Sequence, residues 1–304
     1  MRVATIDIGT NSVLLLVAES SESQGLRAIC ERATVTRLGE GVDQTRTLSS
    51  AAIARTLDCL SEYAAVVASL NVDRTRAVGT SALRDASGGD QFCVAARHVL
   101  GVDVDVLSGD EEARMTFAGA LSGLDQIAVG MIAVFDVGGG STEFVLGDRQ
   151  RISYAVSVDI GSVRLTERHV HSDPPTQEEL DAVARDARQT FATLAKPMLE
   201  CVAVGVAGTV TTLAAVMLGL DAYAGDRVHG HQMSVIEVGD VADRLAALPL
   251  GQRKLVPGLQ PERAEVIVAG ALIVKEMLVH LGSYSLVVSD RGVRWGVAYE
   301  LASR

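Results

Sequence analysis

Runs of hydrophobic residues that end at glycine-containing turns predict most of the elements of this chain. Apolar runs at 3–8 and 13–17 have the character of paired strands, and a second pair follows at 132–137 and 144–146. From 49 to 70 the apolar positions keep helical spacing behind two serines, which predicts a capped helix. Further strands alternate with helices to the end of the chain, so we expect an α/β protein with mixed sheets.

Two later helices have recognisable start signals. Thr176 and Glu179 have the spacing of a helix cap, ahead of an apolar face that includes Phe191. Pro261 suits the first position of a long apolar helix that ends near Gly282. Two further strands are expected, at 201–204 and at 284–289.

The length of the chain adds a domain count to this pattern. At 304 residues and 31.9 kDa, it exceeds the usual size of one hydrophobic core, and roughly 150 residues per domain gives about two domains. Its 48% hydrophobic and 21% charged residues are typical of a globular protein and exclude a disordered one.

The charge excludes two classes of protein. With 27 basic and 38 acidic residues the net charge is −11, whereas a general nucleic-acid binder has a basic surface. The lysines are only Lys196, Lys254 and Lys275, and none follows a glycine, so a lysine-dependent P-loop is excluded. A local group of arginines could still bind a small anion.

The spacing of the cysteines and the character of the apolar segments predict the cellular compartment of the protein. Four widely spaced cysteines in a chain of this length indicate reduced, mostly buried thiols in a cytosolic protein. Asp7 interrupts the first apolar run, which argues against a signal peptide. The longest apolar helix, 266–281, contains Lys275 and Glu276 and is unsuited to a bilayer. We therefore expect a cytoplasmic protein without membrane association.

The sequence also resembles itself. Asp-x-Gly-x-x-Ser follows the first strand of each apolar pair, at 7–12 and again at 136–141. Glycines in such a turn allow close backbone approach, and the turn amides can form an anion-binding concavity. An aspartate beside the turn can hold a divalent metal between protein and phosphate oxygens. The repeat predicts a duplicated phosphate-binding unit.

Other polar loops follow predicted strands. Thr80 and Ser81, with Arg84 close behind, suit phosphate oxygens, but by themselves they favour a capped helix start with Arg84 in solvent. The small residues at 205–212 precede a helix and suit the approach of a phosphate or nucleoside to its first amides.

The spacing of a helix cap predicts different roles for two adjacent glutamates. Ser108 and Glu111 have the spacing of a capping box, which assigns Glu111 to the helix start and leaves Glu112 available in the first turn. Acidic residues there also complement the helix dipole, which is the ordinary interpretation of Glu112.

Two pairs of histidines could in principle bind a metal. His169 and His171 lack a third ligand at helical spacing, so surface positions are favoured. His229 and His231 flank a glycine, which is more typical of a turn.

Taken together and in this order, the motifs resemble those of the exopolyphosphatase / guanosine pentaphosphate phosphohydrolase (Ppx/GppA) family. The resemblance covers nearly the whole chain. The segments that carry it are 7–12, 79–84, 108–114, 136–143, 161–167, 205–209 and 263–265.

The resemblance implies a fold and an activity. The family belongs to the actin-like ATPase superfamily, so we expect two related actin-like (ribonuclease H-like) domains with mixed sheets flanked by helices and the active-site cleft between them. Residues 1–122 with a C-terminal helix at 291–304 are expected to form one domain, and residues 123–290 the other. The implied reaction is hydrolysis of a terminal phosphoanhydride with Mg²⁺ or another divalent cation.

Motif matching then assigns roles residue by residue. Glu112 takes the general-base position, and Arg84 takes that of a phosphate-contacting arginine. Acidic positions around metal and water are Asp7, Asp136 and Glu143. The phosphate-binding positions are Gly9, Thr10, Asn11, Ser12, Thr80, Ser81, Gly138, Gly139, Gly140, Ser141, Thr142, Gly208 and Thr209.

Two departures from the family pattern affect these expectations. Leu14 stands where many members carry a cationic residue, and Trp295 replaces an acidic residue in the closing motif. The sequence ends at Arg304 without the helical HD-type domains of longer members, which help hold long polymers in some relatives. We therefore expect short-chain polyphosphate or guanosine pentaphosphate as substrate rather than long polymers that are degraded processively.

Several alternatives remain open at this stage. The substrate could instead be guanosine pentaphosphate, or the chain could be a kinase-like or ATP-hydrolysing relative. A binding module that closes around an alarmone without turnover, or a cytoskeletal relative, is a further alternative. Family habit favours a homodimer.

Overall fold

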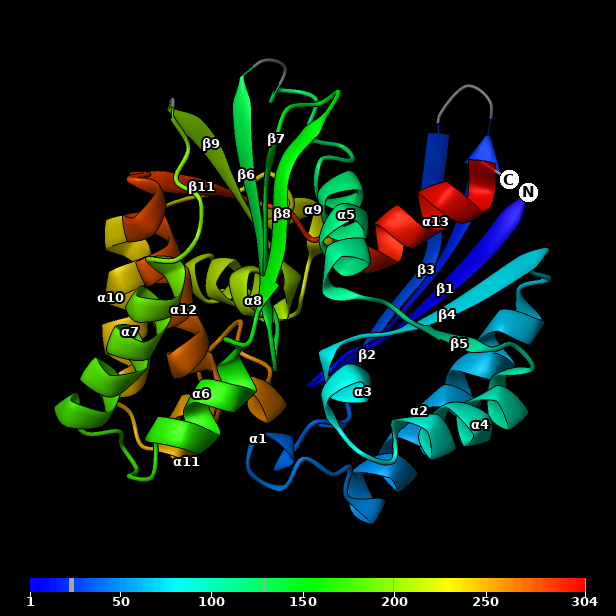
Figure 1. Ribbon diagram of the computed structural model, residues 1–304, viewed down its shortest axis with the longest axis horizontal. Helices are drawn as coiled ribbons and strands as arrows, with labels where there is room; N and C mark the ends of the chain where they lie inside the picture. Colours follow the sequence, from blue (N-terminus) through cyan, green and yellow to red (C-terminus); the bar gives the residue numbers. More distant parts are fainter. Residues whose placement is uncertain (22–24, 128–129, 199, 304) are drawn as a thin grey trace. The chain divides into compact units, whose positions relative to one another are not determined.

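The expected strands form two mixed sheets in the computed structural model, which describes residues 1–21, 25–127, 130–198 and 200–303 (Figure 1). The chain divides into two units: unit 1 is Met1–Gly119 with Val293–Arg304, and unit 2 is Ala120–Gly292. The sequence-based boundaries, after 122 and after 290, lie three and two residues from these. The helix expected at 291–304 is α13 (Val293–Ser303), and Arg304 lies outside the described residues.

Unit 1 contains a five-stranded sheet in the order β3-β2-β1-β4-β5. β1 pairs antiparallel with β2 and parallel with β4. The strands are β1 (Arg2–Ile8), β2 (Ser12–Ser21), β3 (Gly25–Val35), β4 (Arg74–Gly79) and β5 (Val104–Val106). Besides α13, the helices that accompany this sheet are α1 (Val42–Thr45), α2 (Ser50–Ser69), α3 (Ser81–Asp85), α4 (Gly89–Leu100) and α5 (Gly109–Ala120).

Strand alternation explains why helices cover both faces of this sheet. Successive side chains of a strand point to opposite faces, so Ile6 packs with α2 and α4 while Val3 packs with α13. Trp295 fills the second face and is only 2% exposed, so this departure from the family pattern is a core residue. Gly296 beside it allows α13 to approach α5, because a Cβ there would lie 2.0 Å from the Met115 carbonyl oxygen.

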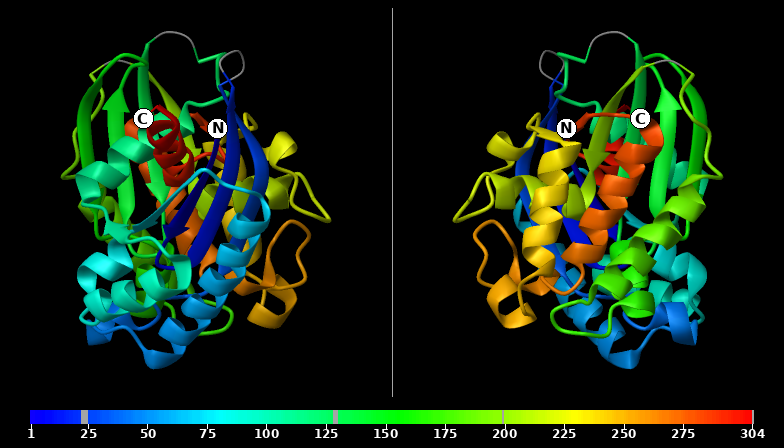
Figure 2. Two further views of the ribbon diagram at one scale, coloured as in Figure 1. Left: turned by 90° about the vertical axis from the view of Figure 1, so that its right-hand side faces the viewer. Right: turned by 90° about the vertical axis from the view of Figure 1, so that its left-hand side faces the viewer.

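Unit 2 contains a six-stranded sheet in the order β10-β11-β9-β6-β7-β8. The strands are β6 (Met131–Val137), β7 (Thr142–Gly147), β8 (Ile152–Val158), β9 (Cys201–Val206), β10 (Gln232–Ser234) and β11 (Ser285–Val288). The helical segments are α6 (Ser162–His169), α7 (Gln177–Phe191), α8 (Ala207–Met217), α9 (Gly225–Val228), α10 (Val235–Ala246), α11 (Leu250–Arg253), η1 (Pro261–Arg263) and α12 (Ile267–Leu281). The apolar helix α12 packs against α6, α7, α8 and α10, and α7, α10 and α12 lie side by side (Figure 2).

The two sheets share one arrangement of strands. β6, β7, β8 and β9 are ordered and paired as β1, β2, β3 and β4 are, with an antiparallel pair and a parallel neighbour around the first strand. The internal duplication seen in the sequence is therefore a duplication of structure. The expected α/β class, with two related domains of mixed sheets flanked by helices, is confirmed.

One predicted helix begins later than expected. Pro261 opens the short 3₁₀ segment η1, and α12 starts only at Ile267. The Arg253 guanidinium donates to the Ala264 carbonyl at 3.0 Å, which holds that carbonyl in a separate turn. The C-terminal end at Gly282, which has a φ of 63°, is as predicted.

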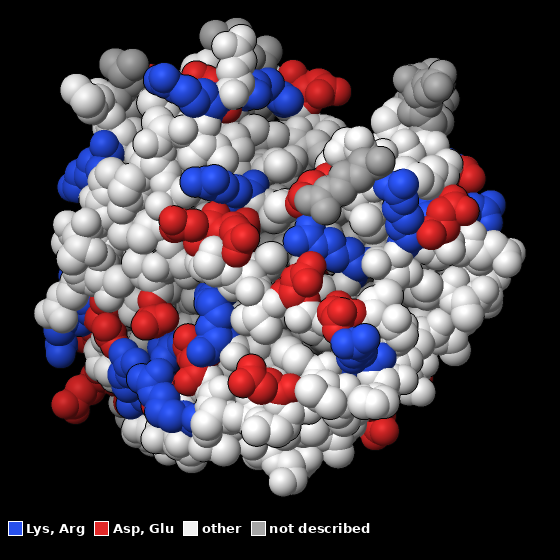
Figure 3. Space-filling view, turned by 45° about the vertical axis from the view of Figure 1, so that its right-hand side comes forward, with Lys and Arg blue, Asp and Glu red and all other residues white. Residues whose placement is uncertain are grey.

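The remaining expectations concern thiols, membranes and surface charge. Only Cys59 of the four thiols is buried; the others are half-buried, so the prediction of mostly buried cysteines was wrong. Within the described residues, no helix is long and apolar enough to cross a membrane. On the face in Figure 3, basic and acidic side chains are interspersed, and no broad basic patch is visible.

Candidate active site

The first glycine turn of unit 1 is assembled by strand pairing. The Gly9 amide donates to the Ser12 carbonyl at 3.0 Å and closes the turn between β1 and β2. Because β1 and β4 run parallel, their carboxyl ends meet at one edge, and the Thr80 amide donates to the Ile8 carbonyl at 3.2 Å. The hydroxyls of Thr10 and Ser81 lie 2.8 Å apart. The predicted phosphate-binding residues of unit 1 therefore lie together at this edge, and Asn11 is buried among them.

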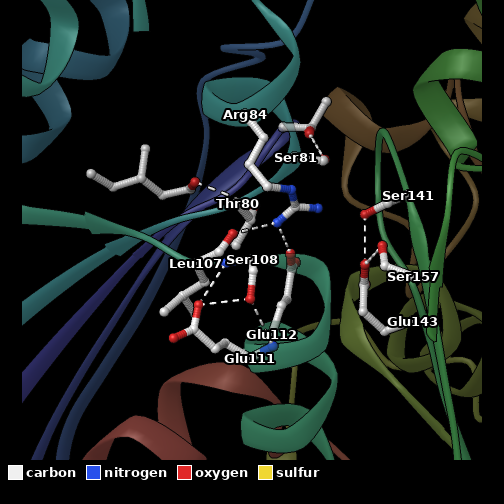
Figure 4. A network of polar contacts seen from close by, with 12 residues as sticks. Thr80, Ser81, Arg84, Leu107, Ser108, Glu111, Glu112, Ser141, Glu143 and Ser157 are labelled. Atoms are coloured by element: carbon white, nitrogen blue, oxygen red, sulfur yellow. Dashed lines mark hydrogen bonds and ion pairs between the residues drawn. The ribbon is translucent and has the colours of Figure 1, made fainter. Parts of the chain in front are cut away.

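Arg84 and Glu112 form an ion pair inside unit 1. Arg84 follows β4 on α3, and its Nη1 donates to the Leu107 carbonyl at 2.9 Å and to Glu112 Oε2 at 2.5 Å (Figure 4). The Glu112 side chain is 8% exposed and that of Arg84 is 21% exposed. The expectation that Arg84 lies in solvent was wrong, because the parallel strand register brings α3 beside the start of α5.

Glu111 is held at the helix start instead. Its Oε2 accepts from the Ser108 amide at 2.9 Å, and its own amide donates to Ser108 Oγ at 3.3 Å. The Ser108 amide, and after it the Ser108 hydroxyl that donates to the same oxygen, lower the pKa of the Glu111 carboxyl. The predicted capping box is confirmed, and the two neighbouring carboxylates have separate roles.

The second glycine turn, in unit 2, repeats the geometry of the first. The Gly138 amide donates to the Ser141 carbonyl at 3.0 Å, as Gly9 does to Ser12. Beyond this turn the hydroxyls of Ser141 and Ser157 both donate to Glu143 Oε1, at 2.8 and 2.7 Å (Figure 4). Glu143 is 1% exposed, so these bonds fix a fully buried carboxylate.

Asp136 and Glu143 stand directly opposite each other on β6 and β7. Both are buried, and like charges at opposite positions of an antiparallel pair destabilise a sheet unless something compensates them. The equivalent pair in unit 1 is Asp7 and Leu14, with only one carboxylate.

The donor set of unit 2 fits a hard divalent cation. Carboxylate oxygens are the ligands that Mg²⁺ prefers, and it is commonly held by one or two of them together with substrate phosphates and waters. Among residues 1–21, 25–127, 130–198 and 200–303, no group of three or more His, Cys, Asp or Glu side chains is placed to hold a metal. The two opposed carboxylates supply as many carboxylate ligands as Mg²⁺ commonly takes from a protein.

The carbonyl groups of both turns are held by the segment after the third strand of each unit. In unit 2, the Ser162 amide donates to Gly138 and the Val163 amide to Gly139, both at 2.9 Å. Gly161 permits this approach, because a Cβ there would lie 2.3 Å from the Gly139 oxygen.

Unit 1 uses the segment 36–41 in the same way. The amides of Thr36 and Arg37 donate to the Asn11 carbonyl at 3.1 and 2.9 Å, and Gly39 donates to Thr10 at 2.9 Å. The duplicated unit thus includes the support of the turn as well as the turn itself. The turns share a sequence motif, whereas the segments that support them, 36–41 and 161–164, do not, so only the turns can be recognised from the sequence.

Two predicted phosphate-binding hydroxyls are engaged with the backbone. Thr142 Oγ1 donates to the Ile160 carbonyl at 2.6 Å, and Thr209 Oγ1 donates to the Val137 carbonyl at 2.8 Å. These threonines hold the turn and the start of α8 against the sheet edge.

Arg263, which is not among the predicted site residues, lies against Gly208. A Cβ at Gly208 would fall 2.1 Å from Arg263 Nη1, so the glycine makes room for the guanidinium at the start of α8. Burial lowers the pKa of Arg263. A cation at the positive end of a helix is electrostatically unfavourable, and an anion between them would offset that repulsion. The signal in the sequence was the Arg-Ala-Glu motif at 263–265.

The histidine pairs behave largely as the residues indicated. His171 is exposed, and His169 Nε2 lies 2.9 Å from Asp186 Oδ2. His229 and Gly230 form a turn, and His229 Nδ1 lies 3.1 Å from Asp290 Oδ1.

These features agree with one family of enzymes. The family model described as the Ppx/GppA phosphatase family matches residues 16–304. The chain belongs to this family. The family is one of enzymes, and the relatives named below are phosphoanhydride hydrolases.

Relatives in the family differ in how much of their length the chain matches. It is 37% identical to exopolyphosphatase 2 of Mycobacterium tuberculosis, over 99% of this chain and 98% of that protein. It is 30% identical to guanosine-5'-triphosphate,3'-diphosphate pyrophosphatase of Vibrio atlanticus, over 98% of this chain but 59% of that protein. The crystal structure of the Ppx/GppA family member of Aquifex aeolicus superposes with a TM-score of 0.83 at 33% identity, covering 100% of this chain and 98% of that one.

Proposed function

We propose that this Ppx/GppA family phosphatase is a Mg²⁺-dependent exopolyphosphatase that releases orthophosphate from the end of inorganic polyphosphate. The match to exopolyphosphatase 2 of M. tuberculosis supports this choice of substrate, because it extends over nearly the whole of both proteins. The guanosine pentaphosphate relative is matched over little more than half of its length.

The observation that carries the proposal is the Arg84–Glu112 ion pair of unit 1, in which Glu112 is buried and Arg84 is half-buried. Burying a charge is costly, and an ion pair retained there is weak evidence for stability but a recognised sign of function. The short bond from Arg84 Nη1 to Oε2 orients the Glu112 carboxylate.

Glu112 acts as the general base in this proposal. The oxygen of water forms a bond to the terminal phosphorus as the bridging P–O bond breaks, and the leaving phosphate keeps that electron pair. The proton of the water passes to Glu112. Glu111, although adjacent in the chain, is occupied by the helix cap.

The glycine turns bind phosphoryl oxygens through their amides, in unit 1 at 9–12 and in unit 2 at 138–141. Asp136 and Glu143 would hold the Mg²⁺, with Asp7 as the single carboxylate at the equivalent edge of unit 1. The metal supplies charge neutralisation of the phosphoryl oxygens.

A panel of substrates tests the proposal. Phosphate release is measured from tripolyphosphate, from polyphosphates of increasing length, from guanosine pentaphosphate and from ATP, each with Mg²⁺ and with a chelator. We expect release from polyphosphate that stops on chelation and returns with added Mg²⁺. Turnover that is indifferent to the metal, or confined to ATP, would contradict the proposal.

A second candidate is hydrolysis of the 5' terminal phosphate of guanosine pentaphosphate. The relative from V. atlanticus favours it, and the terminal group is chemically the same. The same panel separates the two, since this candidate requires a higher kcat/KM for guanosine pentaphosphate than for tripolyphosphate.

A further inference from the structure

Arg164 is a buried cation behind the second glycine turn, and the proposed mechanism assigns it no role. It lies on α6 and is 4% exposed. Its Nε donates to the Gly140 carbonyl at 2.7 Å, and its backbone amide donates to the Gly139 carbonyl at 3.1 Å. Asp159 Oδ1 is 4.0 Å from Nη2, but that carboxylate side chain is 79% exposed. The Nε atom of the guanidinium is therefore directed at the turn.

The bonds from α6 determine which way the turn amides face. The carbonyls of Gly138, Gly139 and Gly140 are all bound from the α6 side. In a trans peptide the C=O and the following N–H point in opposite directions. The amides of Gly139, Gly140 and Ser141 therefore face away from α6, as an anion-binding concavity requires.

We propose that Arg164 is a positioning residue that holds the 138–141 turn with its amides directed at a substrate phosphate. The carbonyls of Gly138 and Gly139 are bound by backbone amides of α6, and these bonds would remain whatever side chain stood at position 164. The Gly140 carbonyl is bound by a side chain, so its peptide, which carries the Ser141 amide, depends on the residue at 164. The buried charge also adds positive potential behind the turn.

The first turn shows why this device is needed in unit 2. Asn11 is the counterpart of Gly140, and its carbonyl is bound by the backbone amides of Thr36 and Arg37. That support does not depend on a side chain. The triple glycine of unit 2 also has more conformational freedom than Gly-Thr-Asn, so its turn needs more restraint.

Arg253 offers a matched control in the same unit. It is 3% exposed, and its guanidinium also donates to backbone carbonyls, those of Leu245, Leu248 and Ala264. It lies on α11, outside the turn and its supports. A purely structural cost of losing a buried arginine should therefore appear equally in Arg253→Gln and Arg164→Gln.

The inference rests on the proposed function, and the experiment separates the two. Arg164→Gln, Arg164→Lys and Arg253→Gln are compared in the full chain for thermal stability, for kcat and KM with tripolyphosphate, and for tripolyphosphate binding by calorimetry in a Glu112→Gln background. Losing a charge-assisted bond should raise KM and weaken binding roughly tenfold in Arg164→Gln, with Arg164→Lys between it and the wild type. Arg253→Gln should lower the melting temperature and leave KM unchanged.

Gly161→Ala provides a second route to the same result. It keeps Arg164, but the added Cβ presses on the Gly139 carbonyl and displaces the turn. We expect a rise in KM here also.

Each result decides between the proposals. Unchanged KM and binding in Arg164→Gln, or an equal loss in Arg253→Gln, overturns the role of Arg164 and leaves the proposed function intact. Binding without hydrolysis in the wild type, lost in Arg164→Gln, overturns the proposed function and supports Arg164. A wild type that does not bind tripolyphosphate overturns the inference.

Discussion

Glu111 and Glu112 differ in surroundings although they are adjacent and chemically alike. Neighbouring positions of a helix do not share a face, so one side chain turns back to Ser108 and the other turns toward Arg84. The capping bonds stabilise the ionised form of Glu111, while Glu112 is buried in an ion pair. At the scale of single residues, orientation on the helix decides which carboxylate is available for chemistry.

Substitution of each glutamate tests this division. Glu112→Gln keeps the shape of the side chain but removes its basicity, so we expect phosphate release to fall by about 10²- to 10⁴-fold with the melting temperature near that of the wild type. Glu111→Gln is the control, and it should retain activity. Turnover that survives in Glu112→Gln would remove Glu112 from the role of base.

Individual helices begin and end largely where local patterns indicate. Ser49 caps α2 by accepting from the Ala52 amide, and both α7 and α10 carry complete capping boxes. In the box of α7, amides including those of Thr176 and His171 hold the pKa of Glu179 at about 2. Capping is local in the chain, which is why short motifs predict it well.

The α7 capping box should make stability depend on pH. The pKa of Glu179 falls from 4.5 to about 2 on folding, so its stabilising effect is complete above pH 4.5 and is lost as the pH falls toward 2. Glu179→Gln should therefore be less stable than the wild type at pH 6, with the difference shrinking below pH 4. Chemical denaturation across this range measures it, and the exposed neighbour variant Glu178→Gln serves as control. A difference that grows on acidification would contradict the assignment.

At the scale of the whole molecule, each unit has its own hydrophobic clusters. Phe191 belongs to the main cluster of unit 2, whereas Trp295, the single tryptophan of the chain, belongs to a cluster of unit 1. Unit 1 is also discontinuous in sequence, because α13 returns to pack on β1 and β2. Tryptophan fluorescence therefore reports on one unit while circular dichroism reports on both.

A core substitution in unit 2 should separate these two signals. Phe191→Ala removes a fully buried ring and should cost unit 2 about 3–5 kcal/mol. We expect part of the ellipticity to melt at lower temperature while the fluorescence transition of Trp295 stays in place. Coincident transitions that shift together would show that the units unfold as one cooperative body.

The sequence by itself determined the α/β class, the duplication, the helix caps and the identity of most candidate residues, because these depend on short patterns that the chain repeats. Only the tertiary structure decided the environments. Parallel pairing of β1 with β4 brings Thr10 to Ser81, and the register of β6 and β7 sets Asp136 opposite Glu143. The engagement of Arg84 with Glu112, and of Arg164 with Gly140, joins residues 28 and 24 positions apart. No local pattern encodes such contacts, since strand register and helix packing across a whole unit determine which side chains meet.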